Sequence, residues 1–156
     1  DDSPNLSMME IRAKARRIAS QYDGIGMIVI DYLQLMGGNS GSENRQLEVS
    51  EISRNLKILA RDFKIPVVAL SQLSRGLEQR QDKRPTLSDL RESGALEQDA
   101  DVVMFLYRPG VYEDDPQRKA DAYLNVAKHR AGAIGDVRLV FQANYTRFEN
   151  FTAKGQ

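Results

Sequence analysis

The sequence predicts an α/β fold: a partial parallel sheet flanked by helices, followed by a tail of antiparallel hairpins. Two apolar runs, residues 27–30 and 66–70, are the first evidence, because each is typical of a strand covered on both faces. Between them, residues 45–63 repeat apolar side chains at helical spacing. A strand–helix–strand unit requires a right-handed crossover and therefore parallel strands. Near the C-terminus, three stretches alternate apolar and polar residues, which indicates hairpins.

A helix is expected before the first strand. Ser7 can cap its first turn and Glu10 can reach back to Ser7. Leu6 and Ile11 occupy the two positions of a hydrophobic staple, and an apolar stripe continues to about Tyr22. These signals predict a helix that begins after Ser7 and ends near Tyr22.

The pattern changes after the second apolar run. Residues 73–100 are polar and carry little apolar periodicity, so we expect a long loop that is either functional or disordered. A third strand is predicted at 102–107, followed by a loop at 109–117. The hairpin strands are predicted at 123–128, 137–142 and 147–151, with turns at 131–132 and 143–144. Because 156 residues is the size of one ordinary domain and the pattern shows no internal repeat and no second domain, we expect a single domain over residues 1–156.

Composition limits the classes of function. With 41% hydrophobic residues among 156, the chain can bury a real core, and its net charge of 0 gives no bulk argument for a polyanionic partner. Cations gather between residues 118 and 147, where the local charge is +4, although such runs are often only solvated faces. The absence of cysteine excludes disulfides and zinc–cysteine sites. No apolar stretch approaches the roughly 20 residues that span a bilayer, so we expect a soluble, cytoplasmic protein with no membrane partner.

Polar residues follow both strands of the predicted parallel pair. Asp31 ends the first apolar run, and Ser71 and Gln72 end the second. The carboxyl ends of parallel strands meet at one edge of a sheet, where α/β proteins bind ligands. A carboxylate there commonly binds the Mg2+ of a nucleoside triphosphate, although a lone Asp at a strand end also serves turns and helix caps. Gln72 is either a surface amide or a group that hydrogen-bonds the terminal phosphate or attacking water.

Two further segments carry candidate binding residues. Lys128 and Arg130 end a predicted strand, where period two places both cations on one side and His129 on the other. The two cations can grip phosphate oxygens or simply face solvent. His129 is the single histidine and is assigned no catalytic role. Residues 91–94, Arg-Glu-Ser-Gly, form either a helix terminus with glycine after the cap or a loop that contacts a phosphate backbone.

Taken together, these segments resemble a known family. They stand in this order: Asp31-Tyr32-Leu33-Gln34-Leu35, Ala69-Leu70-Ser71-Gln72-Leu73, Asp89-Leu90-Arg91-Glu92-Ser93-Gly94, Glu97-Gln98-Asp99-Ala100-Asp101, Lys128-x-Arg130 and Asn144-x-x-Arg147-Phe148. Over essentially the whole chain, the sequence resembles the later part of the RecA-like motor domain of bacterial replicative DNA helicases of the DnaB family. The Arg-Glu-Ser-Gly run with Glu-Gln-Asp-Ala-Asp behind it is the most specific of these motifs.

The resemblance implies a role in ATP hydrolysis for four residues. Asp31 looks like the Walker B acid that binds Mg2+, and Gln72 looks like the sensor that links the phosphate to the DNA loops. Arg130 resembles an arginine finger donated to the ATP of the neighbouring subunit, with Lys128 beside it as a phosphate sensor. The cofactors implied are ATP and Mg2+.

The resemblance also implies DNA and protein partners. Arg91, Glu92, Ser93 and Gly94 look like the loop that follows the backbone of single-stranded DNA. Family members form homohexameric rings, work with a primase and a helicase loader, and translocate 5′ to 3′ while unwinding duplex at the replication fork.

One departure from the family pattern is large. The sequence contains no Gly-x-x-x-x-Gly-Lys-Ser/Thr, and the family's catalytic glutamate has no counterpart here. We therefore expect a C-terminal fragment of the motor that does not hydrolyse ATP by itself. Two alternatives remain at this point: a RecA-like protein that binds DNA as a filament or clamp, and a nonenzymatic module retained for partner binding.

Overall fold

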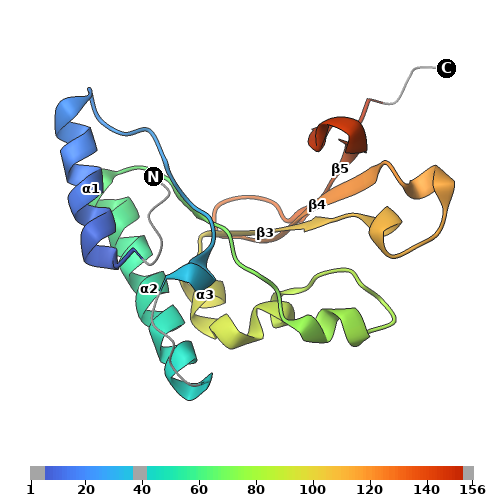
Figure 1. Ribbon diagram of the computed structural model, residues 1–156, viewed down its shortest axis with the longest axis horizontal. Helices are drawn as coiled ribbons and strands as arrows, with labels where there is room; N and C mark the ends of the chain where they lie inside the picture. Colours follow the sequence, from blue (N-terminus) through green and yellow to red (C-terminus); the bar gives the residue numbers. More distant parts are fainter. Residues whose placement is uncertain (1–5, 37–41, 153–156) are drawn as a thin grey trace. The chain divides into compact units, whose positions relative to one another are not determined.

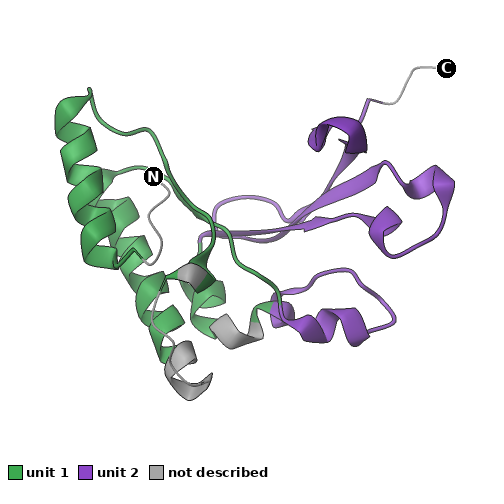
Figure 2. Ribbon diagram, in the orientation of Figure 1, with its two compact units in different colours: residues 1–73, 90–100 green, residues 74–89, 101–156 purple. Residues whose placement is uncertain are grey.

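The structure is a computed structural model that describes residues 6–36 and 42–152, leaving aside the side chains of residues 35, 42–46 and 91–93. The chain divides into two compact units (Figure 2). Unit 1 comprises residues 1–73 and 90–100, and unit 2 comprises residues 74–89 and 101–156.

Unit 1 begins with helix α1, Met8–Gln21, whose first turn is closed by a capping box. The Glu10 backbone N–H donates to Ser7 Oγ at 3.3 Å, and the Ser7 N–H donates to Glu10 Oε2 at 2.8 Å. This confirms the predicted helix start. Helix α2, Ser42–Phe63, lies beside α1 (Figure 1) and begins three residues earlier than predicted. An ion pair between Arg12 and Asp62 joins the two helices.

The predicted parallel pair is present in unit 1. Strand β1, Ile28–Ile30, pairs with β2, Val67–Ala69, in parallel, so that Ile28 lies opposite Val67 and Ile30 opposite Ala69. Between the strands the chain forms a 3-10 turn, η1, Leu33–Leu35, and then α2. The strand–helix–strand prediction is confirmed, with strands shorter than the apolar runs that predicted them.

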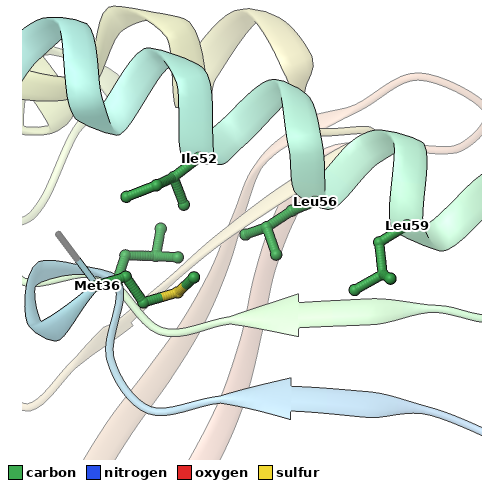
Figure 3. Packing of buried hydrophobic residues seen from close by; sticks show 5 residues of the cluster. Met36, Ile52, Leu56 and Leu59 are labelled. Atoms are coloured by element: carbon green, nitrogen blue, oxygen red, sulfur yellow. The ribbon is translucent and has the colours of Figure 1, made fainter. Parts of the chain in front are cut away.

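The core of unit 1 lies between α2 and the strand pair. Its most buried members are Leu33 and Leu59, with 2% and 1% of their surface exposed, and they pack with Met36, Ile52 and Leu56. Figure 3 shows the side chains of Met36, Ile52, Leu56 and Leu59 between the helix and the two strands. Because Leu33 and Met36 flank the turn after Asp31, the same core fixes that turn against α2.

Residues 73–100 are ordered where a long loop was expected, so that prediction was wrong. The segment forms three short helices: η2, Arg75–Gln79, η3, Leu87–Ser93, and α3, Gly94–Asp99. A kink at Leu90, with φ −82° and ψ 15°, interrupts η3. Short 3-10 turns leave no sustained 3.6-residue period in a sequence, which explains why the pattern was missed.

A buried carboxylate organises the part of this segment that belongs to unit 2. Asp89 is 7% exposed, and its Oδ2 accepts from the Thr86 N–H at 2.7 Å, the Thr86 hydroxyl at 3.0 Å and Arg80 Nη2 at 3.0 Å. In unit 1, α3 is tied to α2 because Ser53 Oγ donates to Asp99 Oδ2 at 2.8 Å. Residues 73–100 are therefore held by tertiary hydrogen bonds, although their sequence has no apolar periodicity.

Unit 2 is built on a four-stranded antiparallel sheet of order β3-β4-β5-β6. Strands β3 and β4 are joined by residues 108–120, and the sheet consists of β3, Val102–Tyr107, β4, Asp121–His129, β5, Gly135–Gln142, and β6, Arg147–Asn150. The predicted hairpins are present, with β4 and β5 longer than predicted and β6 one residue shorter.

The antiparallel sheet begins one strand earlier than expected, because β3 already pairs antiparallel with β4. The connection contains only two 3-10 turns, η4, Pro109–Val111, and η5, Pro116–Arg118, where a loop was predicted. A parallel partner needs a crossover, usually through an α-helix, whereas residues 108–120 form only these two turns and return the chain beside β3 in the opposite direction.

Candidate functional site

Asp31 and Gln72 emerge at the same edge of the parallel pair. The last paired residues are Ile30 and Ala69, after which the Leu70 N–H donates to Ile30 O and the Leu33 N–H donates to Leu70 O, both at 2.9 Å. Asp31 is exposed in the turn that follows β1, and the peptide bond between Asp31 and Tyr32 is cis. The exposed Gln72 lies three residues beyond the end of β2.

Gln34 connects these two strand ends, and we did not single it out from the sequence. Its side-chain Nε2 donates to the Gln72 carbonyl at 3.2 Å and to Ser71 Oγ at 3.1 Å, while its Oε1 accepts from the Gln72 N–H at 3.2 Å. A glutamine in a turn has no local signal that separates it from an ordinary surface amide. Only the partner, 38 residues away, identifies it.

The donor set at this edge fits a magnesium ion shared with a phosphate. Mg2+ is commonly bound by one or two carboxylates together with substrate phosphates and water, and Asp31 supplies one exposed hard-oxygen ligand. Among the described residues, no group of three or more His, Cys, Asp or Glu side chains could enclose a metal.

Lys128 and Arg130 lie at the end of β4 in unit 2. Lys128 is opposite Val103, and β4 ends at His129, so Arg130 lies one residue beyond the strand. The Arg130 N–H donates to Asp101 O at 2.9 Å, and its Nε is 3.7 Å from Asp101 Oδ1, with 52% of the side chain exposed. Arg130 is thus at the surface of its unit, where it can reach a group outside the chain.

Much of the local positive charge between residues 118 and 147 is paired within unit 2. Arg118 contacts Glu113 and Arg147 contacts Glu149, while Arg138 Nη2 is 3.0 Å from Asp121 Oδ1. His129 Nδ1 lies 3.4 Å from Ala133 O, a contact within the turn. These contacts favour the interpretation of this stretch as a solvated face.

Residues 91–94 span a junction between two short helices. Arg91, Glu92 and Ser93 end η3, and their side chains lie outside the described part of the structure. Of the two alternatives for this run, a helix terminus is present, because η3 ends at Ser93, and Gly94 follows it directly as the first residue of α3. Its φ is not positive, and a Cβ placed on it would meet no atom within 4 Å. The fold of this chain therefore does not itself require glycine at position 94.

The parallel strand pair with its polar edge, the covering helices and the antiparallel sheet together define an α/β protein of the RecA-like class, as predicted. The profile of the DnaB-like helicase C-terminal domain matches residues 1–150, and the chain belongs to that family. Asp31 and Gln72, at the ends of the two strands, lie in two of the segments on which the resemblance to this family was based.

Curated relatives and solved structures agree with this assignment. The chain is 57% identical over 151 residues to the replicative DNA helicase DnaB of Geobacillus stearothermophilus, covering 96% of this chain and 33% of the relative. It is 53% identical over 150 residues to DnaB of Haemophilus influenzae, covering 96% and 32%. The chain thus spans about a third of the length of these relatives.

Two solved structures share the fold at high similarity. One is described as an ATPase domain, with a TM-score of 0.86 and 46% identity over 94% of this chain and 52% of that one. The other, a DnaB-like replicative helicase studied with its interactions with primase, has the same TM-score and identity and is covered over 35% of its length. No helix within residues 6–36 and 42–152 is long and apolar enough to cross a membrane.

Proposed function

We propose that this chain is the C-terminal part of the motor of a replicative DNA helicase. In this proposal the parent protein is a cytoplasmic homohexamer that hydrolyses ATP with Mg2+, translocates 5′ to 3′ on single-stranded DNA and unwinds duplex at the replication fork. The observation that carries it is the convergence of Asp31 and Gln72 at one edge of a parallel strand pair, in a chain of the DnaB family.

Asp31 and Gln72 would act on the nucleotide bound by their own subunit. Asp31 is the carboxylate that would hold Mg2+, which when bound neutralises charge on the phosphate oxygens. The Gln72 carboxamide is uncharged and both donates and accepts, so it can hydrogen-bond the terminal phosphate or the attacking water and change partners when the phosphate leaves. Because the next residues enter the segment from 73 onward, that change can be passed toward the DNA loop.

Arg130 and Lys128 would act on the nucleotide of a neighbouring subunit. The exposed Arg130 guanidinium and its long contact with Asp101, 3.7 Å, support this role, because an exposed ion pair is worth little and can be exchanged for a phosphate. An arginine finger typically raises the hydrolysis rate on the order of a thousandfold or more. Lys128, beside it on β4, would add a second charge close to the same phosphate.

Residues 91–94 would contact the DNA backbone. Arg91 would supply the cation, Ser93 a hydroxyl, and Glu92 would orient Arg91, while backbone N–H groups complete the contact. Gly94 supports this role, because its own fold leaves the space beside its Cα open and a backbone without a side chain permits close approach of a ligand.

Several parts of the proposed machine would come from outside these 156 residues. The sequence contains no phosphate-cradling Gly-x-x-x-x-Gly-Lys-Ser/Thr, so ATP hydrolysis would depend on the rest of a longer protein, and this chain alone would be inactive. A primase is a proposed partner because a solved relative is described with its primase interactions, and a helicase loader is proposed from the family resemblance.

The test compares three arginine variants in the full-length protein. Arg130→Ala should abolish DNA-stimulated ATP hydrolysis while nucleotide binding and DNA binding are retained, because the finger touches only the reacting phosphate. Arg91→Ala should weaken single-stranded DNA binding and lower the slope of log affinity against log salt by about 1. Arg16→Ala, at an exposed position on α1, is the control and should match wild type in both assays.

Four outcomes would contradict the proposal. Wild-type turnover in Arg130→Ala would remove the finger assignment, and an unchanged salt slope in Arg91→Ala would remove the DNA assignment. An open helical assembly instead of a closed ring in electron micrographs would favour a DNA-binding filament. If the full-length protein has no ATPase activity with DNA and Mg2+, the motor interpretation fails as a whole.

A further inference from the structure

The side chain of Gln34 continues the strand pairing of β1 and β2 beyond the strands. Backbone hydrogen bonds join Leu70 to Ile30 and Leu33 to Leu70, each at 2.9 Å. The next connection in the same direction is made by the Gln34 carboxamide, which both accepts from the N–H of Gln72 and donates to its carbonyl, each at 3.2 Å. A primary amide that bonds both groups of one residue occupies the place of a neighbouring peptide unit.

Two features distinguish this contact from a casual surface hydrogen bond. Gln34 lies in η1 next to Leu33, which is 2% exposed, and two residues before Met36, which is 5% exposed, so its backbone is anchored in the core against α2. The strands themselves contain only three residues each, so a connection at their end makes up a substantial part of the pairing. Gln34 Nε2 also donates to Ser71 Oγ at 3.1 Å, which holds the residue before Gln72 as well.

We propose that Gln34 is a positioning residue that sets the backbone of Gln72 relative to Asp31 and thereby couples the nucleotide site to the segment beginning at Leu73. The inference rests on the proposed function, because it assumes that Gln72 senses the phosphate of a bound nucleotide. Gln34 holds the main chain of Gln72 and leaves the Gln72 side chain to the ligand. A shift of the turn after Asp31 is therefore transmitted to Gln72 through two hydrogen bonds.

The chemistry of the contact requires a glutamine. Glutamate has nearly the same size but no donor at neutral pH, so its carboxylate would face the Gln72 carbonyl and repel it. Alanine removes both the donor and the acceptor. Both changes leave Asp31 and the Gln72 side chain in the protein, so a loss of activity reports on positioning.

The experiment measures ATPase activity of the full-length protein with and without single-stranded DNA for Gln34→Ala, Gln34→Glu, Gln72→Ala and the double variant Gln34→Ala/Gln72→Ala. We expect Gln34→Ala to lower the DNA-stimulated kcat about tenfold, the effect of one or two net hydrogen bonds, while KM for ATP changes by less than about twofold. The size-matched Gln34→Glu should show a comparable loss. Gln21→Ala, an exposed glutamine at the end of α1, is the matched control and should match wild type.

The double variant tests whether Gln34 acts through Gln72. If it does, Gln34→Ala should add little to the defect of Gln72→Ala, because residues that act as a unit are not additive. If Gln34 has only a structural role, Gln34→Ala should lower the melting temperature, and the loss of kcat in the double variant should be the product of the losses in the two single variants. That result would overturn the inference. If Gln34→Ala does not fold, Gln34→Glu becomes the test. A DNA-stimulated kcat equal to wild type in Gln34→Glu would then overturn the inference.

The result also separates this inference from the proposed function. If the wild type shows DNA-stimulated ATPase activity that Arg130→Ala abolishes, yet both Gln34 variants retain wild-type kcat, the positioning role is wrong and the motor stands. If the wild type shows no such activity, the proposed function fails and the positioning role fails with it.

Discussion

The end of the parallel pair in unit 1 and the end of β4 in unit 2 carry their proposed functional residues in opposite ways. In unit 1, neutral amide hydrogen bonds fix the Gln72 backbone, and the buried side chains of Leu33 and Met36 hold the turn that follows Asp31. In unit 2, the Arg130 side chain is 52% exposed and its contact with Asp101 is a long ion pair. Neutral hydrogen bonds fix atoms in place, whereas exposed ion pairs contribute about 0–1 kcal/mol and exchange easily.

This difference matches the work proposed for each end. A sensor must report small changes at the phosphate, so its main chain has to be held against the same core as the metal ligand. A finger must leave its own subunit's carboxylate for a phosphate on a neighbour, so a weak exposed pair is the better resting contact. Changes to the buried support of each unit should therefore have larger effects than changes to exposed contacts.

The largest effect is expected from the core beneath the unit 1 edge. Leu59→Ala should destabilise the protein by about 2–5 kcal/mol, because Leu59 is 1% exposed and its loss leaves a cavity between α2 and the strands. Urea denaturation followed by circular dichroism measures the change. Ile58→Ala, one position along α2 and 41% exposed, is the control and should cost far less. Equal losses at the two positions would contradict the packing described for α2.

A smaller effect is expected from the buried carboxylate of unit 2. Asp89→Ala should cost about 1–3 kcal/mol, because the Thr86 N–H and the Arg80 guanidinium lose the acceptor they share. The same denaturation experiment applies, together with limited proteolysis between residues 80 and 90, which should become faster. The exposed Asp114→Ala is the control, and protection from proteolysis equal to wild type in Asp89→Ala would count against this role.

The smallest effect concerns the exposed capping box of α1. Hydrogen bonds from the Ser7 backbone and hydroxyl lower the pKa of Glu10 below 4.5. Because the pKa is lower in the folded state, this carboxylate contributes stability above about pH 4.5 that is lost as the pH falls through the folded pKa. Glu10→Gln should therefore be less stable than wild type at pH 7, with the difference shrinking toward pH 3. Melting temperatures across that range measure it, with exposed Glu78→Gln as the control. A difference that does not vary with pH would show that the Glu10 charge contributes nothing.

Much of the fold could be predicted because the signals are local. The capping residues Ser7 and Glu10 lie within one helical turn, and the two apolar runs are each a few consecutive residues. The parallel pairing followed from the intervening helix, since a right-handed crossover leaves little choice. Placement of Asp31 and Gln72 at one edge followed from the same topology, whereas the roles of Arg130, Lys128 and residues 91–94 stay predictions.

What could not be predicted depends on partners far apart in sequence. The order of residues 73–100 comes from hydrogen bonds of Asp89 and Ser53, which leave no periodic pattern in the sequence. The antiparallel pairing of β3 was decided by a connection that forms two 3-10 turns and no crossover helix, not by β3's own residues. The sequence by itself determined the helices, the strands and the edge at which the acid and the amide emerge, because local spacing and chain connectivity specify these. Only the tertiary structure decided that Gln34 holds Gln72, because a side-chain hydrogen bond across 38 residues exists only once the strands have paired.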